Sequence, residues 1–220
     1  MKTTFIVSSM LAGAALCVNA ATFYTISSVG SSNSVAFYQL SELIEGPGVG
    51  YDASAPHDQA AVGANGRAWV TNNPNGNGDY YAVAPAPVIV FDLGSDVLLT
   101  EISTWGYDTG NTNGAKDFSL RFATAAEGTG AFGTSITFNP TFEADFATTP
   151  RDSNVFGQSV TAQYVEMTIT DNWRGFQGGT PGGDRVGLGE VAFAQVPEPS
   201  SALLAFSAAS LMLLRRKRNA

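Results

Sequence analysis

The strongest constraint on the fold is a two-residue alternation of apolar and polar side chains. In residues 164–170, the apolar side chains of Val165, Met167 and Ile169 occupy every second position, and residues 117–123 repeat this pattern. Successive side chains of a β-strand point to opposite faces of a sheet, so these runs predict strands with one buried face and one solvated face.

Similar short runs extend along most of the chain. They are separated by loops rich in Gly, Asn, Asp and Pro, and no long helical period lies between them. The predicted strands are residues 22–27, 35–40, 88–93, 98–105, 117–123, 135–138, 162–170 and 186–194. Short strands joined by long loops favour an all-β fold, and this number of strands favours a jelly-roll β-sandwich.

The N-terminus has the features of a secretory signal peptide. Lys2 supplies a positive charge, a largely apolar stretch follows, and Val-Asn-Ala at residues 18–20 forms a small-residue cleavage site. We expect residues 1–20 to be removed, so that the mature chain begins at Ala21. The single cysteine, Cys17, lies in the removed segment, and the mature chain therefore forms no disulfide.

The C-terminal residues 196–220 combine a proline motif, an apolar run and a basic end. The apolar run, residues 200–214, would reach only about 22 Å as a helix, against the roughly 30 Å of a bilayer core. It therefore predicts a short hydrophobic helix that anchors weakly. The basic cluster holds its end on the cytoplasmic side, which leaves the folded domain outside. The cluster consists of Arg215, Arg216, Lys217 and Arg218.

These features occur in the order of a known sorting signal. Pro197-Glu198-Pro199, the apolar run and the Arg-rich end resemble the PEP-CTERM signal of Gram-negative bacteria, over residues 196–220 alone. The resemblance implies secretion through the inner membrane, transient membrane attachment, and processing by an exosortase in bacteria that make exopolysaccharide. The implied location is the cell surface or the extracellular matrix. An ordinary C-terminal membrane tail is the alternative.

The charge of the central region limits its partners. Residues 21–195 are long enough for one domain with a buried core. Residues 21–196 carry 18 Asp and Glu against 6 Lys and Arg, a net charge of −12. Such a surface repels phosphate backbones, so we expect no nucleic-acid partner. A neutral sugar or calcium suits it better, although solubility alone also accounts for the acidity.

Three long predicted loops, residues 46–81, 106–115 and 171–185, carry aromatic and basic residues. Aromatic rings stack on the apolar faces of sugars, while Asp, Asn and Arg bind the hydroxyls. A packing role over one end of the core is the alternative for the tryptophans. The candidate ligand-binding residues are Trp69, Tyr107, Trp173 and Arg174.

Five segments in chain order look like strands of the discoidin, or coagulation factor 5/8 type C, family: residues 87–94, 99–107, 118–122, 162–169 and 187–193. The resemblance implies the galactose-binding-like jelly-roll fold. It also implies a non-catalytic module that binds glycans through loops at one end, often with a structural calcium ion. Glu190 resembles the last-strand acid that ligates calcium in many members. The family's Asp-Gly-x-x-x-Thr-x-Trp stretch is not present in recognisable form, and its nearest approach is residues 65–69.

The remaining side chains restrict the available chemistry. His57 is the only histidine, which excludes a zinc site of the usual His and Cys type, and the chain has no Gly-x-Ser-x-Gly motif. Calcium needs only oxygen ligands. Loop residues that could supply them are Asp108, Asn111, Asn113, Asp171, Asn172 and Asp184.

We therefore expect an extracellular polysaccharide-binding protein that is not an enzyme. One alternative is a structural matrix or surface-coat protein that has no affinity for sugar. The other is a polysaccharide-active enzyme, which would need two carboxylates facing each other across a cleft.

Overall fold

The computed structural model describes residues 22–30, 32–35, 38–44, 68–74, 78–107, 112–146, 151–174 and 183–195. The expected signal peptide and the whole sorting segment, including Pro197, Glu198, Pro199 and the basic cluster, lie outside these residues, as do His57, Asp108 and Asn111. In the part that the structure describes, no helix is long and apolar enough to span a membrane.

The described strands pair in antiparallel fashion, and they differ widely in length. They are β1 (Thr22–Tyr24), β2 (Ser28–Gly30), β3 (Trp69–Val70), β4 (Val88–Gly106), β5 (Asp117–Ala123), β6 (Thr141–Glu143), β7 (Asp152–Ile169) and β8 (Gly187–Gln195). A single turn of 3-10 helix, η1 (Leu40–Ile44), buries Leu43 and packs against β2, β3 and β8. The expected all-β fold is confirmed.

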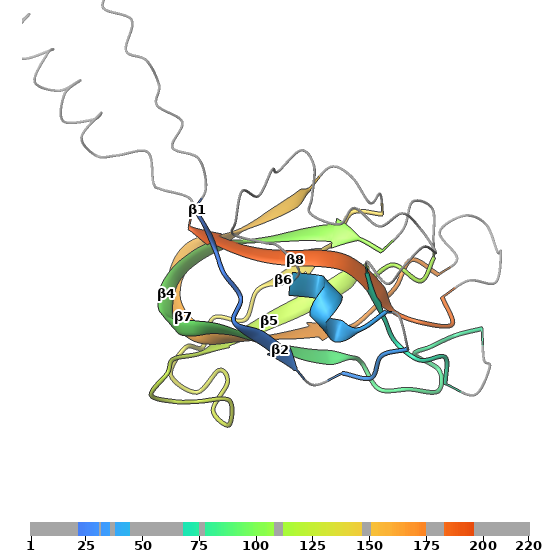
Figure 1. The fold of residues 1–220 in the computed structure, drawn as a ribbon, viewed down its shortest axis with the longest axis horizontal. Helices are drawn as coiled ribbons and strands as arrows, with labels where there is room; N and C mark the ends of the chain where they lie inside the picture. The colour runs from blue at the N-terminus through green and yellow to red at the C-terminus, as the bar shows by residue number, and fades with distance from the viewer. Residues whose placement is uncertain are drawn as a thin grey trace, which may run out of the picture. The chain divides into compact units, whose positions relative to one another are not determined.

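The long strands β4 and β7 contribute to both layers of a sandwich. Residues 88–92 of β4 pair with residues 164–168 of β7, in a layer with β2, β5 and β6. Residues 97–104 of β4 pair with residues 152–162 of β7, in a layer with β1, β3 and β8. Figure 1 shows the two strands curving together from one layer into the other at the left of the view. This arrangement is the predicted jelly-roll β-sandwich.

A glycine bulge bends β4 between the layers. Gly94 has a φ of 79°, and its N–H donates to Oδ1 of Asp92 at 2.8 Å. The register of β4 against β7 shifts between Asp92 and Val97. A bulge with glycine at positive φ bends a strand without ending it. The prediction of separate strands at residues 88–93 and 98–105 is therefore wrong, because both belong to β4.

The predicted alternation fills the core between the layers. Trp105, near the end of β4, is also buried. Phe91 of one layer and Phe193 of the other pack edge to face, with ring centroids 5.4 Å apart. The alternating residues that are at most 1% exposed are Phe118, Leu120, Phe122, Val165, Met167 and Ile169.

The strand predicted at residues 35–40 is not formed in the described part of that segment. The backbone N–H of Tyr38 donates to the carbonyl of Val35 at 3.2 Å, and the two residues form an isolated bridge. The chain then enters η1 at Leu40. The described residues of this run therefore do not use the period of two that the sequence suggested.

The strand predicted at residues 135–138 is also wrong. The carboxylate of Glu127 accepts hydrogen bonds from the backbone N–H of Ser135 at 3.2 Å and from its hydroxyl. These bonds hold the segment in a loop. The edge strand β6 begins after Pro140 instead, and the carbonyl of Pro140 accepts the N–H of Leu120 on β5 at 2.9 Å.

The two ends of the sandwich differ in construction. At the end that we call the loop end, long loops connect the strands, and their described parts lie within residues 71–87, 107–116, 144–151 and 170–186. At the opposite end, which we call the bend end, β4 and β7 pass from layer to layer. Thr22 and Gln195 are strand partners on the bend-end side of β8.

Candidate functional site

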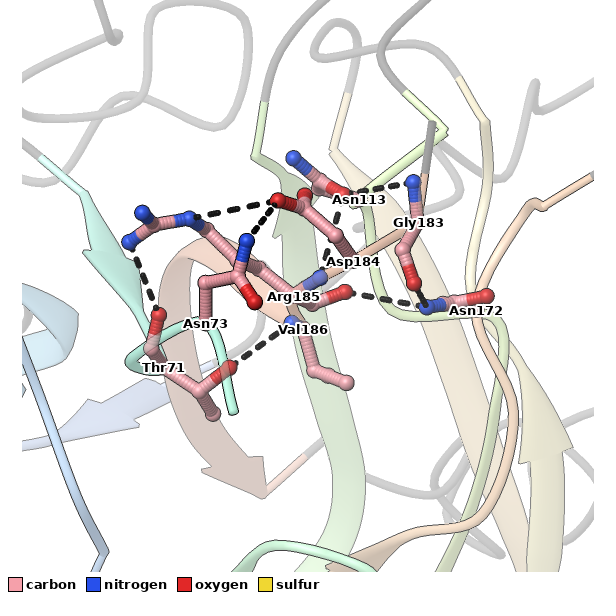
Figure 2. Close-up of polar contacts among 8 residues, drawn as sticks. All are labelled: Thr71, Asn73, Asn113, Asn172, Gly183, Asp184, Arg185 and Val186. Carbon is pink, nitrogen blue, oxygen red and sulfur yellow. Dashed lines mark hydrogen bonds and ion pairs between the residues drawn. The ribbon is translucent and has the colours of Figure 1, made fainter. Parts of the chain in front are cut away.

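At the loop end, two asparagine side chains bind the backbone that leads into β8 (Figure 2). Asn172, which is 3% exposed, donates from Nδ2 to the carbonyls of Gly183 and Arg185 at 3.0 and 2.9 Å. Oδ1 of Asn113 accepts the N–H groups of the same two residues at 2.7 and 3.3 Å. The segment before β8 is therefore held by the beginning of its own loop, through Asn172, and by the loop between β4 and β5, through Asn113.

A third loop, after β3, reaches the same segment (Figure 2). Thr71 is fully buried, and its Oγ1 accepts the N–H of Val186 at 3.0 Å. Nη1 of Arg185 donates to the carbonyl of Thr71 at 3.3 Å, while Nδ2 of Asn73 donates to Oδ2 of Asp184. Buried backbone groups are costly unless they are paired, so these side chains stabilise loops that no strand ladder supports.

Arg174 lies at the exposed margin of this network. Its backbone N–H donates to Oδ1 of Asn172 at 3.3 Å, and its side chain is 46% exposed and forms an ion pair with Asp79. Gly183 has a φ of 81°, and a Cβ there would lie 2.6 Å from Cβ of Arg174. Glycine at this position therefore allows Arg174 to pack close to the backbone while its guanidinium group remains at the surface.

Trp173 is largely covered by its neighbours. It is 8% exposed, its ring meets Phe146 edge to face at 5.2 Å, and Nζ of Lys116 lies 5.7 Å from the ring centroid. Lys116 also forms ion pairs with Asp117 at 3.2 Å and Asp171 at 3.3 Å. Hydrogen bonds to these two carboxylates raise the pKa of Lys116, which therefore stays charged at neutral pH.

The other two predicted ligand residues differ in exposure. Trp69 is fully buried in β3, and its indole N–H donates to Oγ of Ser34 at 3.2 Å. A ring in this position offers no face to a sugar, which favours the packing interpretation. Tyr107 is partly exposed and lies 6.3 Å from Tyr38 in an edge-to-face contact. Its ring rests on Gly187, where an added Cβ would lie 2.7 Å away.

The structure thus brings the four predicted residues to one end but gives them different environments. Trp69 and Trp173 pack into the interior, whereas Tyr107 and Arg174 reach the surface. Thr71, Asn73 and Asp79 join the same end and were not predicted. The only sequence signal for them was the Asn-rich and Gly-rich composition of their loop.

Two adjacent tyrosines fasten the loop before β4 to the end of β7. The hydroxyl of Tyr81 donates to the carbonyl of Ile169 at 3.0 Å, and the rings of Tyr80 and Tyr81 meet edge to face at 5.2 Å. Burial raises the pKa of Tyr81, and the negative charge of Asp171 raises it further. Tyr81 therefore keeps its proton, and the hydrogen bond persists across the neutral and mildly basic range.

Glu190, the predicted calcium ligand, lies in the buried strand β8. Glu190 is 4% exposed on β8 opposite Trp105, and both of its carboxylate oxygens are buried. No group of three or more His, Cys, Asp or Glu side chains that could hold a metal is found among the residues that the structure describes. The predicted ligands Asn113 and Asn172 bind backbone groups instead. Calcium binding through Glu190 stays a prediction.

Comparison with known proteins identifies a shared fold. No protein-family model and no curated protein matches the chain. A solved structure of truncated AlyQ with CBM32 and alginate lyase domains matches with a TM-score of 0.50 and 18% identity, over 81% of this chain and 34% of that one. The present chain therefore spans about a third of the length of that protein. This match supports the jelly-roll β-sandwich fold that the sequence predicted.

Two further solved structures are similar. The CBM32 of AlyQ in complex with 4,5-unsaturated mannuronic acid has a TM-score of 0.48 and 17% identity, over 78% of this chain and 96% of that one. The family 32 CBM from C. perfringens NanJ in complex with galactose has a TM-score of 0.49 and 13% identity, over 80% of this chain and 100% of that one.

Proposed function

We propose that this protein is exported and binds carbohydrate of the cell surface or exopolysaccharide layer through its loop end. The observation that supports this most strongly is the side-chain network that fixes the segment before β8. A site on a fixed backbone loses little conformational entropy when a ligand binds. The fold shared with a protein that carries a CBM32 domain is consistent with this function.

The exposed groups of the loop end suit sugar recognition. The guanidinium of Arg174 offers hydrogen-bond donors in a planar fork, and the carboxylate of Asp79 beside it offers acceptors. The partly exposed ring of Tyr107 offers an apolar surface. Adjacent donors and acceptors can bind neighbouring hydroxyls of one sugar, with no catalytic step.

The point where the sorting segment leaves the domain suits presentation of the loop end. Gln195 is the last residue of β8 and pairs with Thr22. The nine residues of β8 separate this point from the loop end by roughly 27 Å at the usual rise of a strand. A domain held by this segment is attached at one end and exposes its ligand-binding loops at the other.

Binding is tested with residues 21–196, which form one compact unit. On a glycan array and with the native exopolysaccharide, we expect saturable binding that Arg174→Ala weakens by about tenfold, as one charged hydrogen bond requires. Thr141→Ala, an exposed change on β6, is the matched control. Self-assembly without sugar binding would support a structural matrix protein instead. Release of new reducing ends would support an enzyme.

The sorting function has a separate test. In the native host, a Pro197→Ala and Pro199→Ala double variant should remain unprocessed and membrane-attached, because the exosortase motif is lost. The mass of the recovered protein measures this outcome. Normal processing of the double variant would contradict sorting by an exosortase and support an ordinary membrane tail.

A further inference from the structure

A groove lies on the outer face of the layer that contains β2, β4 and β7. Its volume is about 500 Å³, within the range of roughly 300–1,000 Å³ typical of small-ligand sites. Val88, Val90 and Asp92 of β4 point into it, whereas the alternate residues of β4 are buried in the core. Thr129 and Phe132, from the loop between β5 and β6, form one wall.

Two rows of side chains cross this face. In one row, Ser28 pairs with Asp92 and Asp92 pairs with Tyr164. In the other, Gly30 pairs with Val90, Val90 with Glu166, and Glu166 with Arg121. The β2 members of both rows are small, and a Cβ added to Gly30 would meet no atom within 4 Å. The groove therefore has an open side over β2 and an aromatic side at Tyr164 and Phe132. The residues of these rows other than Arg121 line the groove.

Each carboxylate of the groove is oriented through one oxygen. Oδ1 of Asp92 accepts hydrogen bonds from Nε2 of Gln163 at 2.9 Å and from the N–H of Gly94 at 2.8 Å. Oε1 of Glu166 accepts from Nε of Arg121 at 2.7 Å and lies 2.6 Å from its Nη2. Among the described residues, these contacts leave the second oxygen of each carboxylate available to accept a ligand hydroxyl.

Tyr164 is oriented in a similar way. Nε2 of Gln163 donates to the hydroxyl oxygen of Tyr164 at 3.0 Å, so the phenolic hydrogen can point to a ligand. The wall is held by Glu127, whose carboxylate accepts from the N–H and the hydroxyl of Thr124 at 2.8 and 3.0 Å and from Ser135. The loop that carries Phe132 is therefore closed on itself and ordered before any ligand arrives.

We propose that this groove is a second saccharide site, specific for a neutral oligosaccharide. The carboxylates of Asp92 and Glu166 accept sugar hydroxyls, and the rings of Tyr164 and Phe132 cover the apolar faces of the sugar. Asp92, whose carboxylate accepts hydrogen bonds from neutral donors, repels uronate groups, whereas Arg121 offsets the charge of Glu166. The proposal rests on the carbohydrate function and extends it to a distinct surface. A chain with two sites can hold one polymer at two points, which raises its avidity.

The test uses the full-length protein, purified in mild detergent, and calorimetric titration. The probes are neutral gluco- and galacto-oligosaccharides, with oligogalacturonate as the anionic comparison. Gly30→Phe fills the open side of the groove, Tyr164→Phe removes only the hydroxyl, and Thr141→Ala is the control. We expect two neutral sugars bound per chain, a stoichiometry near one for Gly30→Phe, and a several-fold weaker groove affinity for Tyr164→Phe. Asp92→Asn should admit oligogalacturonate.

The outcomes separate this proposal from the carbohydrate function itself. One sugar bound per chain, with an affinity that the groove variants do not change, would overturn the groove and leave the loop-end function standing. Absence of binding to every saccharide would overturn both. Chemical-shift changes at Tyr164 and Phe132 on titration locate the sugar directly, and changes confined to residues around Arg174 would contradict the groove. The thermal midpoint of Gly30→Phe unfolding, compared with that of the unmodified protein, shows whether the variant folds.

Discussion

The loop end and the groove use polar side chains for different purposes. At the loop end, Asn113, Asn172 and Thr71 bind backbone groups of the chain itself. In the groove, Asp92 and Glu166 are each held through one oxygen. The difference follows from where strands stop, because backbone groups beyond a strand lose their ladder partners and need side chains instead. Polar substitutions should therefore lower stability at the loop end and lower affinity in the groove.

The largest expected effect on stability is that of Trp69→Ala at the loop end. A fully buried tryptophan leaves a large cavity, so we expect a loss of about 3–5 kcal/mol in the free energy of unfolding. Urea denaturation followed by circular dichroism measures it, and Trp69→Phe should retain most of the stability. An unchanged urea midpoint with lost sugar binding would show that Trp69 is a ligand residue, which would break the comparison.

Asn172→Ala should have the next largest effect. Its side chain satisfies two carbonyls and one N–H in a buried position, so removal leaves unpaired groups and costs about 2–3 kcal/mol. Asn139 is the matched control, because it is exposed and bonds only to the carbonyl of Thr137, and Asn139→Ala should change stability by less than about 0.5 kcal/mol. Equal effects of the two substitutions would contradict a structural role for the loop-end network.

The strands show how much of the fold the sequence could predict. The alternation in residues 117–123 and 164–169 identified the strands and their buried faces correctly, because it reports only local geometry. The path of β4 was missed, since Gly94 is equally compatible with a turn and with a bulge. Pairing with β7, far away in the chain, decides between the two. The sandwich was predictable, whereas the exchange of strands between its layers was not.

The loop end and the groove depend even more than the strands on contacts between residues that are far apart in the sequence. Asn113 and Asn172 were predicted as possible calcium ligands, and nothing in the sequence indicated that their side chains bind the backbone of Gly183 and Arg185. The groove gave no sequence signal, because outward residues of a strand are usually polar and solvated. It exists only because the loop that carries Phe132 folds over β4 and β7.

Low pH should destabilise the loop beside the groove more than it destabilises the loop end. Hydrogen bonds from the Ser135 hydroxyl and the Thr124 backbone lower the pKa of Glu127 to about 2, from an ordinary value of 4.5. A depressed pKa stabilises the loop above pH 4.5, and this stabilisation is lost as the pH falls toward 2. Asn113 and Asn172 do not titrate. Hydrogen exchange should show the amide of Ser135 losing protection over this range, while the amide of Gly183 changes less.

Glu127→Gln supplies the control for this acid effect. The side-chain amide introduced at this position cannot ionise. The protection of the Ser135 backbone N–H against hydrogen exchange should therefore be lower at pH 4.5 and should depend less on pH between 4.5 and 2. Equal loss of protection at Ser135 and Gly183 in the unmodified protein would indicate global acid unfolding and would remove the distinction between the regions.

The smallest expected effects on stability belong to the two surface ion pairs. Arg121 and Arg174 are 49% and 46% exposed, with Glu166 and Asp79 as their partners, so Arg121→Ala and Arg174→Ala should each cost about 0.2–1 kcal/mol. Their effects on binding should differ, since Arg121 orients a groove carboxylate and Arg174 belongs to the loop end. Combined in one chain, the substitutions should weaken both sites with additive free energies, because independent sites do not share partners. The double-mutant cycle is measured with a short oligosaccharide that cannot reach both sites, and strong non-additivity would then mean that loop end and groove form a single site.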